Sequence, residues 1–203
     1  MFNLAVFVSG RGSNLESILN YFSESSITVK VVISNKPDCY AVKLAAENNI
    51  ECIFVGKAET PKFIDFERLI EKLKILKIDL IVLAGYLKKI PDEFIDQFPN
   101  KIINIHPALL PSFGGKGMYG ANVHKAVFNS SAKVSGATVH FVNSSYDEGK
   151  IIAQRVIDIS KVRSPEEIAE KVLKIEHELL PFVIKKFEEG KVQLLGSRVY
   201  LKN

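Results

Sequence analysis

The feature that most constrains the fold is a continuous apolar run over residues 4–8, which ends directly in Ser-Gly-Arg-Gly-Ser. An apolar run without polar alternation predicts a short strand that is buried on both of its faces. Residues 14–22 follow with apolar side chains at helical spacing, so the chain passes from this strand directly into a helix. Buried strands that alternate with helices are typical of parallel sheets in α/β proteins.

The alternation continues along the first half of the chain and changes in the second half. Further strands are predicted at residues 29–33, 52–55, 80–84 and 102–105, with helices at 40–48 and 61–76. Two later strands, at 134–142 and 151–156, flank a turn, and residues 166–189 predict a long helix that Pro181 should kink. We therefore expect an α/β fold with a Rossmann-like, doubly wound, mostly parallel sheet and an antiparallel C-terminal portion.

Length, charge and cysteine content narrow the class of protein. The 203 residues have an ordinary globular composition, and the net charge of +4 comes from lysines spread along the chain, so nucleic-acid binding is not demanded. No apolar run approaches the roughly 18 residues of a membrane span. Cys39 and Cys52, in a chain without a recognisable signal peptide, favour reduced thiols in the cytoplasm. Because no repeat or linker is found, residues 1–203 are expected to form one domain.

The loop after the first strand, residues 9–14, indicates an anion site. Its two glycines let backbone N–H groups approach an anion, and the start of the next helix adds partial positive charge. A dinucleotide-binding loop would need a third glycine where Leu15 stands and an acidic residue where Ser34 and Asn35 end the second strand. The loop therefore favours a phosphate monoester. The alternative is a plain strand-to-helix turn that is capped by one of its own side chains.

A polar pair stands at the end of the strand predicted at 102–105. Asn104 and His106 are two residues apart, so their side chains project from the same side, and Pro107 ends the strand where a doubly wound sheet binds ligands. Burying such a pair is unfavourable unless its hydrogen bonds are satisfied or it is used in chemistry. A satisfied structural pair is the alternative. Asp147 reads first as a turn residue and equally as a carboxylate that orients a histidine, whereas a packed structural role is expected for His140.

Several motifs occur in order along the chain: Gly12-Ser13-Asn14-Leu15, Leu83-Ala84-Gly85-Tyr86, Asn104-Ile105-His106-Pro107 with Leu109-Leu110-Pro111, Gly136-Ala137-Thr138-Val139-His140-Phe141-Val142, and Asp147-Glu148-Gly149. Together they closely resemble the folate-dependent formyltransferases of purine biosynthesis, over essentially the whole chain. The resemblance implies the formyltransferase fold, with a phosphate-binding half over about residues 1–100 and a folate and catalytic half over about 101–203.

The activity that this resemblance implies is transfer of the formyl group of 10-formyltetrahydrofolate to the amine of glycinamide ribonucleotide, giving formylglycinamide ribonucleotide and tetrahydrofolate. Asn104 and protonated His106 would donate to the developing oxyanion, and Asp147 would raise the pKa of His106. The folate is a co-substrate, and no tightly bound cofactor is expected. No His, Cys or carboxylate set has the spacing of a metal site, so no metal is expected. The partners are these small molecules, without nucleic acid or membrane, and the protein is expected in the cytoplasm as a monomer or weak homodimer.

The resemblance also implies binding residues for each substrate. For glycinamide ribonucleotide they are Gly12, Ser13, Asn14, Leu15, Glu16 and Glu176, although Glu176 could equally be a solvated helix carboxylate. For the folate they are Lys62, Leu87, Lys88, Lys89, Ile90, Asn104, Asn143, Ser144, Ser145, Tyr146 and Asp147. The chain departs from the family at Lys88-Lys89, where one basic residue and an aliphatic residue are usual, at Lys62, where arginine is frequent, and at Leu173, where a glutamine can contact the ribosyl group.

A glycine-rich stretch lies in the second half of the chain, and three other protein classes share part of these features. Residues 114–122 predict a lid before a helix that begins near Val123, and His124 beside it is a candidate to approach the phosphate. A formyltetrahydrofolate hydrolase should add an N-terminal regulatory domain, and a methionyl-tRNA formyltransferase a C-terminal domain for tRNA; we expect neither here. A non-catalytic nucleotide-binding module would explain the glycine loop and leave Asn104, His106 and Asp147 as coincidence.

Overall fold

The computed structural model describes residues 1–56 and 62–202. These residues form two compact units, Met1–Ile103 and Asn104–Asn203. Strand β6 (Ile102–His106) carries the chain from the first unit into the second. The expectation of a single domain stays a prediction.

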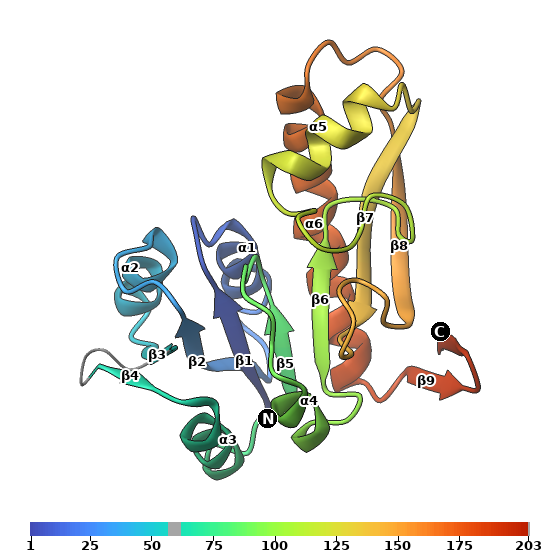
Figure 1. Ribbon diagram of the computed structural model, residues 1–203. Coiled ribbons are helices and arrows are strands. Elements are labelled where there is room, and N and C mark those ends of the chain that lie inside the picture. The colour runs from blue at the N-terminus through green and yellow to red at the C-terminus, as the bar shows by residue number, and fades with distance from the viewer. Residues whose placement is uncertain (57–61, 203) are drawn as a thin grey trace. The chain divides into compact units, whose positions relative to one another are not determined.

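The first unit is built on parallel strands. They are β1 (Phe2–Val8), β2 (Ile27–Ser34), β3 (Glu51–Val55), β4 (Phe63–Ile64) and β5 (Leu80–Leu83), in the spatial order β4-β3-β2-β1-β5 (Figure 1). In β1, every residue from Leu4 to Val8 is fully buried, as the unbroken apolar run predicted. The central position of β1 places its carboxyl end, and the glycine loop that follows, at the ligand-binding edge of the sheet.

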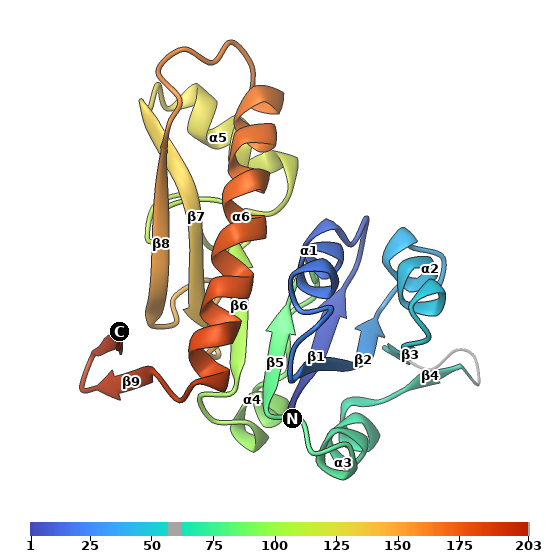
Figure 2. The same ribbon diagram turned by 180° about the vertical axis from the view of Figure 1, so that it is seen from behind.

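Four helices complete the first unit. They are α1 (Ser13–Tyr21), α2 (Tyr40–Glu47), α3 (Phe66–Ile75) and α4 (Asp92–Gln97). Helix α1 packs beside α2, and α3 beside α4 (Figure 2). The glycine loop connects β1 to α1, and residues 85–90 connect β5 to α4.

The helix predicted over residues 61–76 begins later than expected. Phe63 and Ile64 instead pair with β3 as the short strand β4, where the Phe63 ring lies 5.9 Å from the ring of Phe54. Asp65 then caps α3, because its side chain accepts a hydrogen bond of 2.9 Å from the backbone N–H of Arg68. Pro61, the predicted first residue of this helix, lies outside the described residues.

The second unit combines an antiparallel strand pair with a long helix. Its elements after β6 are α5 (Ala121–Asn129), β7 (Val134–Phe141), β8 (Ile151–Asp158), α6 (Pro165–Glu188), β9 (Val192–Leu195) and β10 (Arg198–Leu201). Helix α6 packs along β7 and β8 and against α5 (Figures 1 and 2). Ser164 caps α6, which continues as a helix through Pro181. The turn between β7 and β8 directly follows the end of β7.

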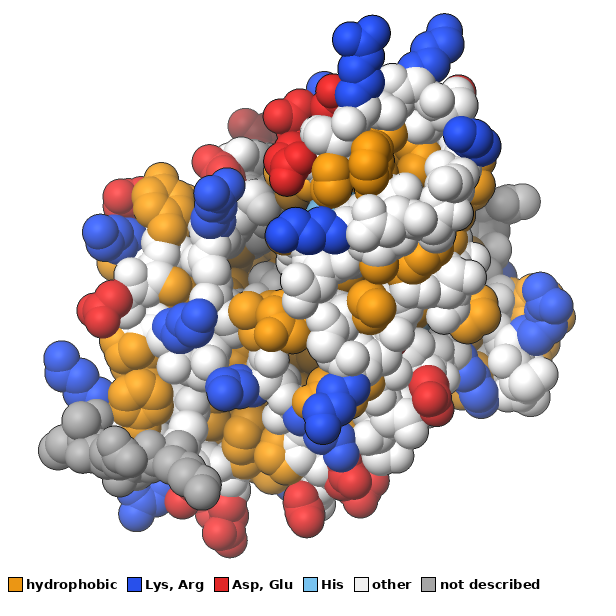
Figure 3. Space-filling view, turned by 45° about the horizontal axis from the view of Figure 1, so that its top comes forward, with side chains coloured by type: hydrophobic (Ala, Val, Ile, Leu, Met, Phe, Trp, Pro, Cys, Tyr) orange, Lys and Arg blue, Asp and Glu red, His pale blue; other side chains and the backbone are white. Residues whose placement is uncertain are grey.

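The predicted fold class is confirmed. Parallel strands alternate with helices in the first unit, and β7 and β8 pair antiparallel in the second. Among the helices of residues 1–56 and 62–202, none is long and apolar enough to span a membrane. On the face shown in Figure 3, Lys and Arg side chains are dispersed, in keeping with their spacing along the sequence.

Candidate active site

Four polar side chains of the second unit form one cluster. Asn104 and His106 belong to β6, His140 to β7, and Asp147 to the turn before β8. Asn104 Nδ2 lies 3.1 Å from His140 Nε2. Asp147 places Oδ2 3.7 Å from His106 Nδ1 and Oδ1 3.6 Å from His140 Nε2. The structure thus brings together the three residues that the sequence singled out as catalytic, and it adds His140.

His106 is almost completely enclosed, with 3% of its surface exposed. Its Nε2 lies 2.9 Å from the carbonyl oxygen of Phe113, so Nε2 carries the hydrogen and donates it. Burial lowers the pKa of His106 below its usual value, while the charge of Asp147 and the bond to Phe113 oppose that shift. Asp147 thus raises the pKa of His106 as expected, but burial outweighs the carboxylate and the net shift is downward. The ring nitrogen that faces Asp147, Nδ1, is the one on which a second proton would be stabilised.

Asp147 is held as a carboxylate. Burial opposes its ionisation, but His140, the charge of His106 and the Gly115 N–H together lower the pKa of Asp147 below its usual value. The Gly115 N–H donates to Oδ2 over 2.9 Å. The backbone of Asp147 adopts a left-handed conformation, with φ of 57°, which Asp tolerates better than most residues. At neutral pH the cluster therefore contains one fixed negative charge.

His140 orients the amide of Asn104. Its Nδ1 lies 2.8 Å from the carbonyl oxygen of Phe141, so Nδ1 carries a hydrogen. In the neutral ring, Nε2 then accepts a hydrogen bond from Asn104 Nδ2, which fixes which end of the Asn104 amide is the donor. Sequence reasoning missed this role, although His140 belongs to one of the motifs that carry the family resemblance.

Gly149 allows the turn to close against His140. A Cβ atom at this position would overlap the carbonyl oxygen of Phe141 and lie 3.4 Å from His140 Nδ1. Only glycine therefore fits here without moving the strand that carries His140.

The predicted lid over residues 114–122 and the residue before it, Phe113, both contact the cluster. Phe113 accepts from His106, and Gly115 donates to Asp147. Phe113 has a left-handed backbone, with φ of 57°. Helix α5 begins at Ala121, slightly before the predicted start, and places His124 in the interior, 8% exposed, with Nδ1 buried and without a hydrogen-bond partner in the described part of the chain. Burial and the charge of His106 lower the pKa of His124.

The glycine loop of the first unit has the backbone shape that an anion site needs. Gly12 adopts φ of 77° at the N-terminus of α1, and a Cβ there would lie 2.7 Å from Ala41 Cβ. Asn14 is 9% exposed, and its Oδ1 is buried with no hydrogen-bond partner among residues 1–56 and 62–202. Leu15 lies in the core, whereas Glu16 is exposed and Ser13 half-buried. Leu15 can therefore contact a ligand only through its backbone.

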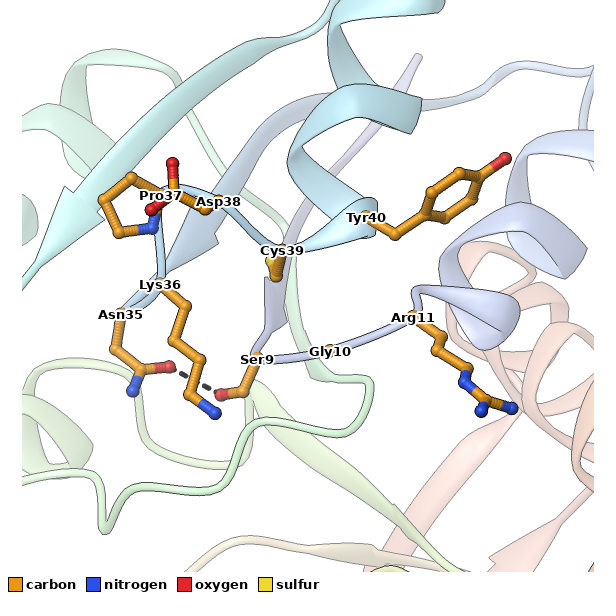
Figure 4. Close-up of a pocket in the computed structure, with 9 residues that line it drawn as sticks. All are labelled: Ser9, Gly10, Arg11, Asn35, Lys36, Pro37, Asp38, Cys39 and Tyr40. Atoms are coloured by element: carbon orange, nitrogen blue, oxygen red, sulfur yellow. Dashed lines mark hydrogen bonds between the residues drawn. The ribbon is translucent and has the colours of Figure 1, made fainter.

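A cavity of about 520 Å³ adjoins this loop at the carboxyl ends of β1 and β2 (Figure 4). It is lined by Ser9, Gly10, Arg11, Asn35, Lys36, Pro37, Asp38, Cys39 and Tyr40. Ser9 Oγ donates to Asn35 Oδ1 over 2.6 Å, and the two side chains join the ends of the neighbouring strands. The thiols of Cys39 and Cys52 are free.

The residues expected to bind the folate are mostly exposed. In the first unit these are Lys62, Leu87, Lys88 and Lys89, whereas Ile90 is buried. Lys89 forms an ion pair of 3.1 Å with Asp92. In the second unit, Asn143, Ser144, Ser145 and Tyr146 form the exposed part of the turn that leads to Asp147, and Asn143 Oδ1 accepts from the Ser145 N–H over 3.2 Å.

Two residues of α6 were expected near the amine substrate. Glu176 is 7% exposed, so its side chain is not the solvated carboxylate of the alternative interpretation. Leu173 is half-buried. Among residues 1–56 and 62–202, no group of three or more His, Cys, Asp and Glu side chains is arranged to hold a metal ion.

Comparison with known proteins decides the family. The family model described as formyl transferase matches residues 2–184. The chain belongs to the formyl transferase family. The chain is 46% identical over 185 residues to the chloroplastic phosphoribosylglycinamide formyltransferase of Arabidopsis thaliana, a match that covers 89% of the chain and 63% of the relative. It is 35% identical to the phosphoribosylglycinamide formyltransferase of Haemophilus influenzae, over 99% of the chain and 94% of the relative.

A solved structure extends the similarity to the fold. The crystal structure of phosphoribosylglycinamide formyltransferase from Anaplasma phagocytophilum matches the chain with a TM-score of 0.89 and 31% identity, over 100% of the chain and 94% of that structure. The chain thus spans less than two thirds of the plant relative and nearly all of the bacterial ones.

Proposed function

We propose that this formyl transferase moves the formyl group of 10-formyltetrahydrofolate to the amine of glycinamide ribonucleotide, as a phosphoribosylglycinamide formyltransferase of purine biosynthesis. The observation that carries the proposal is the carboxylate of Asp147, held ionised between His106 and His140 while His140 orients Asn104. A plain turn residue would not need two buried imidazoles beside it. The names of the relatives support the same reaction.

The chemistry assigns a role to each member of the cluster. The amine nitrogen attacks the formyl carbon, and the carbonyl electrons move onto oxygen, where Asn104 Nδ2 and His106 Nε2 donate hydrogen bonds. Each such donor is worth about 3 kcal/mol in the transition state. The bond between the formyl carbon and the folate nitrogen then breaks. Asp147 accepts the proton that the amine releases, and this proton is then passed to the folate nitrogen as it leaves, which returns Asp147 to the carboxylate.

The formyl oxygen would take the place of a protein carbonyl. His106 Nε2 now donates to Phe113, so a formyl oxygen in that position must displace the Phe113 carbonyl. That exchange supports a lid function for residues 112–122 during substrate binding.

The glycine loop is the proposed phosphate site. Backbone N–H groups around Gly12 and the start of α1 favour a phosphate, and Asn14 Oδ1 is a buried acceptor suited to a ribose hydroxyl. In the first unit, Ser13, Leu15 and Glu16 are further residues that we propose for the ribonucleotide, and Lys62 and residues 87–90 are proposed for the folate. In the second unit, Glu176 is proposed for the ribonucleotide, and Asn104 and residues 143–147 for the folate.

Turnover with 10-formyltetrahydrofolate, measured with and without glycinamide ribonucleotide, tests the proposal. Formation of tetrahydrofolate that depends on the ribonucleotide is expected. Formate release without the amine would instead indicate a hydrolase, and binding without turnover a nucleotide-binding module. A cytoplasmic location and a monomer or weak homodimer are part of the same proposal.

A further inference from the structure

Residues 85–90, between β5 and α4, are held by few contacts. Tyr86 packs its ring on Phe7, with the centroids 5.2 Å apart, and Ile90 is buried. Leu87 is 42% exposed. In the described part of the chain, the backbone of this stretch makes a single hydrogen bond, in which the Leu87 N–H donates to Ser9 Oγ over 3.0 Å. The other backbone N–H and C=O groups of residues 85–90 are therefore available to a ligand.

The surroundings of Ser9 fix its hydroxyl in position to accept the hydrogen bond from the Leu87 N–H. It directly follows β1 as the first residue of the glycine loop and is 2% exposed. Because its oxygen accepts from Leu87, its single hydrogen goes to Asn35 Oδ1, 2.6 Å away. This second bond fixes the hydroxyl rotamer (Figure 4). Ser9 thus joins the end of β2, through Asn35, to the stretch that follows β5.

We propose that Ser9 is a positioning residue for the folate co-substrate. Its hydroxyl sets the place of residues 87–90, whose free backbone groups would bind the folate's heterocyclic ring. The inference rests on the proposed function, which assigns those residues to the folate. The glycine loop has a separate anchor, a 3.1 Å hydrogen bond from the Ala41 N–H to the Gly10 carbonyl oxygen. Removal of the Ser9 hydroxyl should therefore disturb the folate more than the ribonucleotide.

The test compares Ser9→Ala with a matched control, Ser34→Ala. Ser34 ends β2 and is fully buried. Among residues 1–56 and 62–202, its hydroxyl contacts only its own turn, at the backbone of Lys36 and near Cys39. In S9A, the KM for 10-formyltetrahydrofolate should rise about fivefold, the size of one lost hydrogen bond. The KM for glycinamide ribonucleotide and kcat should stay within about twofold. S34A should change neither KM, and S9T, which keeps the hydroxyl, should restore the folate KM.

A second measurement reads the contact directly. Hydrogen exchange of the Leu87 amide should accelerate in S9A and not in S34A, because only the first loses the acceptor of that N–H. KM does not depend on the fraction of folded enzyme, so partial unfolding of a variant does not mimic the effect.

Three outcomes would overturn the inference: an unchanged folate KM in S9A, an equal rise of both KM values, or an unchanged exchange rate at Leu87. A wild-type enzyme without formyl transfer would refute the proposed function itself. A wild-type enzyme that turns over while S9A keeps its folate KM would refute only the role of Ser9.

Discussion

Asp147→Asn is the substitution that isolates the charge of the candidate active site. Asparagine has nearly the same shape, tolerates the left-handed backbone of this position, and can still accept the hydrogen bond from the Gly115 N–H. What it loses is the negative charge beside His106 and the ability to take up a proton. The fold and folate binding should therefore persist.

The distances in the cluster give the size of the effect. With an effective dielectric constant of about 20, a carboxylate 3.7 Å from His106 Nδ1 stabilises a protonated ring by about 4 kcal/mol. If the transition state needs that protonated ring, the loss corresponds to roughly a thousandfold fall in kcat. Without the carboxylate the pKa of His106 falls further, because the charge of Asp147 no longer opposes the effect of burial. The remaining activity of the variant should therefore increase as the pH is lowered.

Turnover of both single variants and the double variant provides the assay, with circular dichroism to confirm folding. His106→Ala should be about as damaging as Asp147→Asn, and the double variant little worse than either, because the two side chains act as one unit. A D147N enzyme within tenfold of wild type, or penalties that simply add, would leave Asp147 as a turn residue and refute the reasoning.

Three further predictions concern other parts of the molecule. Gly12→Val should greatly raise the KM for glycinamide ribonucleotide with little change for the folate, because its Cβ would crowd Ala41 and its φ of 77° disfavours a branched residue; equal weakening of both substrates would contradict the phosphate site. Activity should survive exhaustive chelation with 10-formyltetrahydrofolate as donor, and a strict need for formate and ATP would exclude that donor. His124 has a lowered pKa, so the folded state binds fewer protons than the unfolded state and the free energy of unfolding should fall as pH drops below about 6.5. Urea unfolding of His124→Leu should show a smaller fall than wild type between about pH 7.5 and 5.5, and equal falls would show that His124 does not contribute.

A strand could be predicted from the sequence where both of its faces are buried, because every residue of such a strand must then be apolar. The run over residues 4–8 is apolar throughout because β1 is covered on both sides. The start of α3 was not predictable in this way, because Phe63 and Ile64 also fit a helical pattern. Their partner is β3, so pairing across the sheet decided their structure against the local pattern.

The candidate site could be predicted in part, because the spacing of residues along a strand shows which side chains share a face. The two-residue spacing of Asn104 and His106 places both on one face of β6, where both contact the same cluster. His140 could face either side of its strand, and its contacts with Asn104 and Asp147 join residues that only the fold brings together. The direction of the pKa shift of His106 could not be predicted from the sequence either, because it depends on how deeply the ring is buried.

The tight turn at Gly149 has a consequence for the interpretation of sequence variants. In a library of all single substitutions selected for activity, this position would be as intolerant as Asp147, because any side chain there collides with Phe141 and displaces His140. A map of intolerant positions would then mark as catalytic a residue that has no side chain to react. The amount of folded protein separates the two classes: substitutions of Gly149 would lower it, whereas D147N would leave abundant, correctly folded and inactive protein.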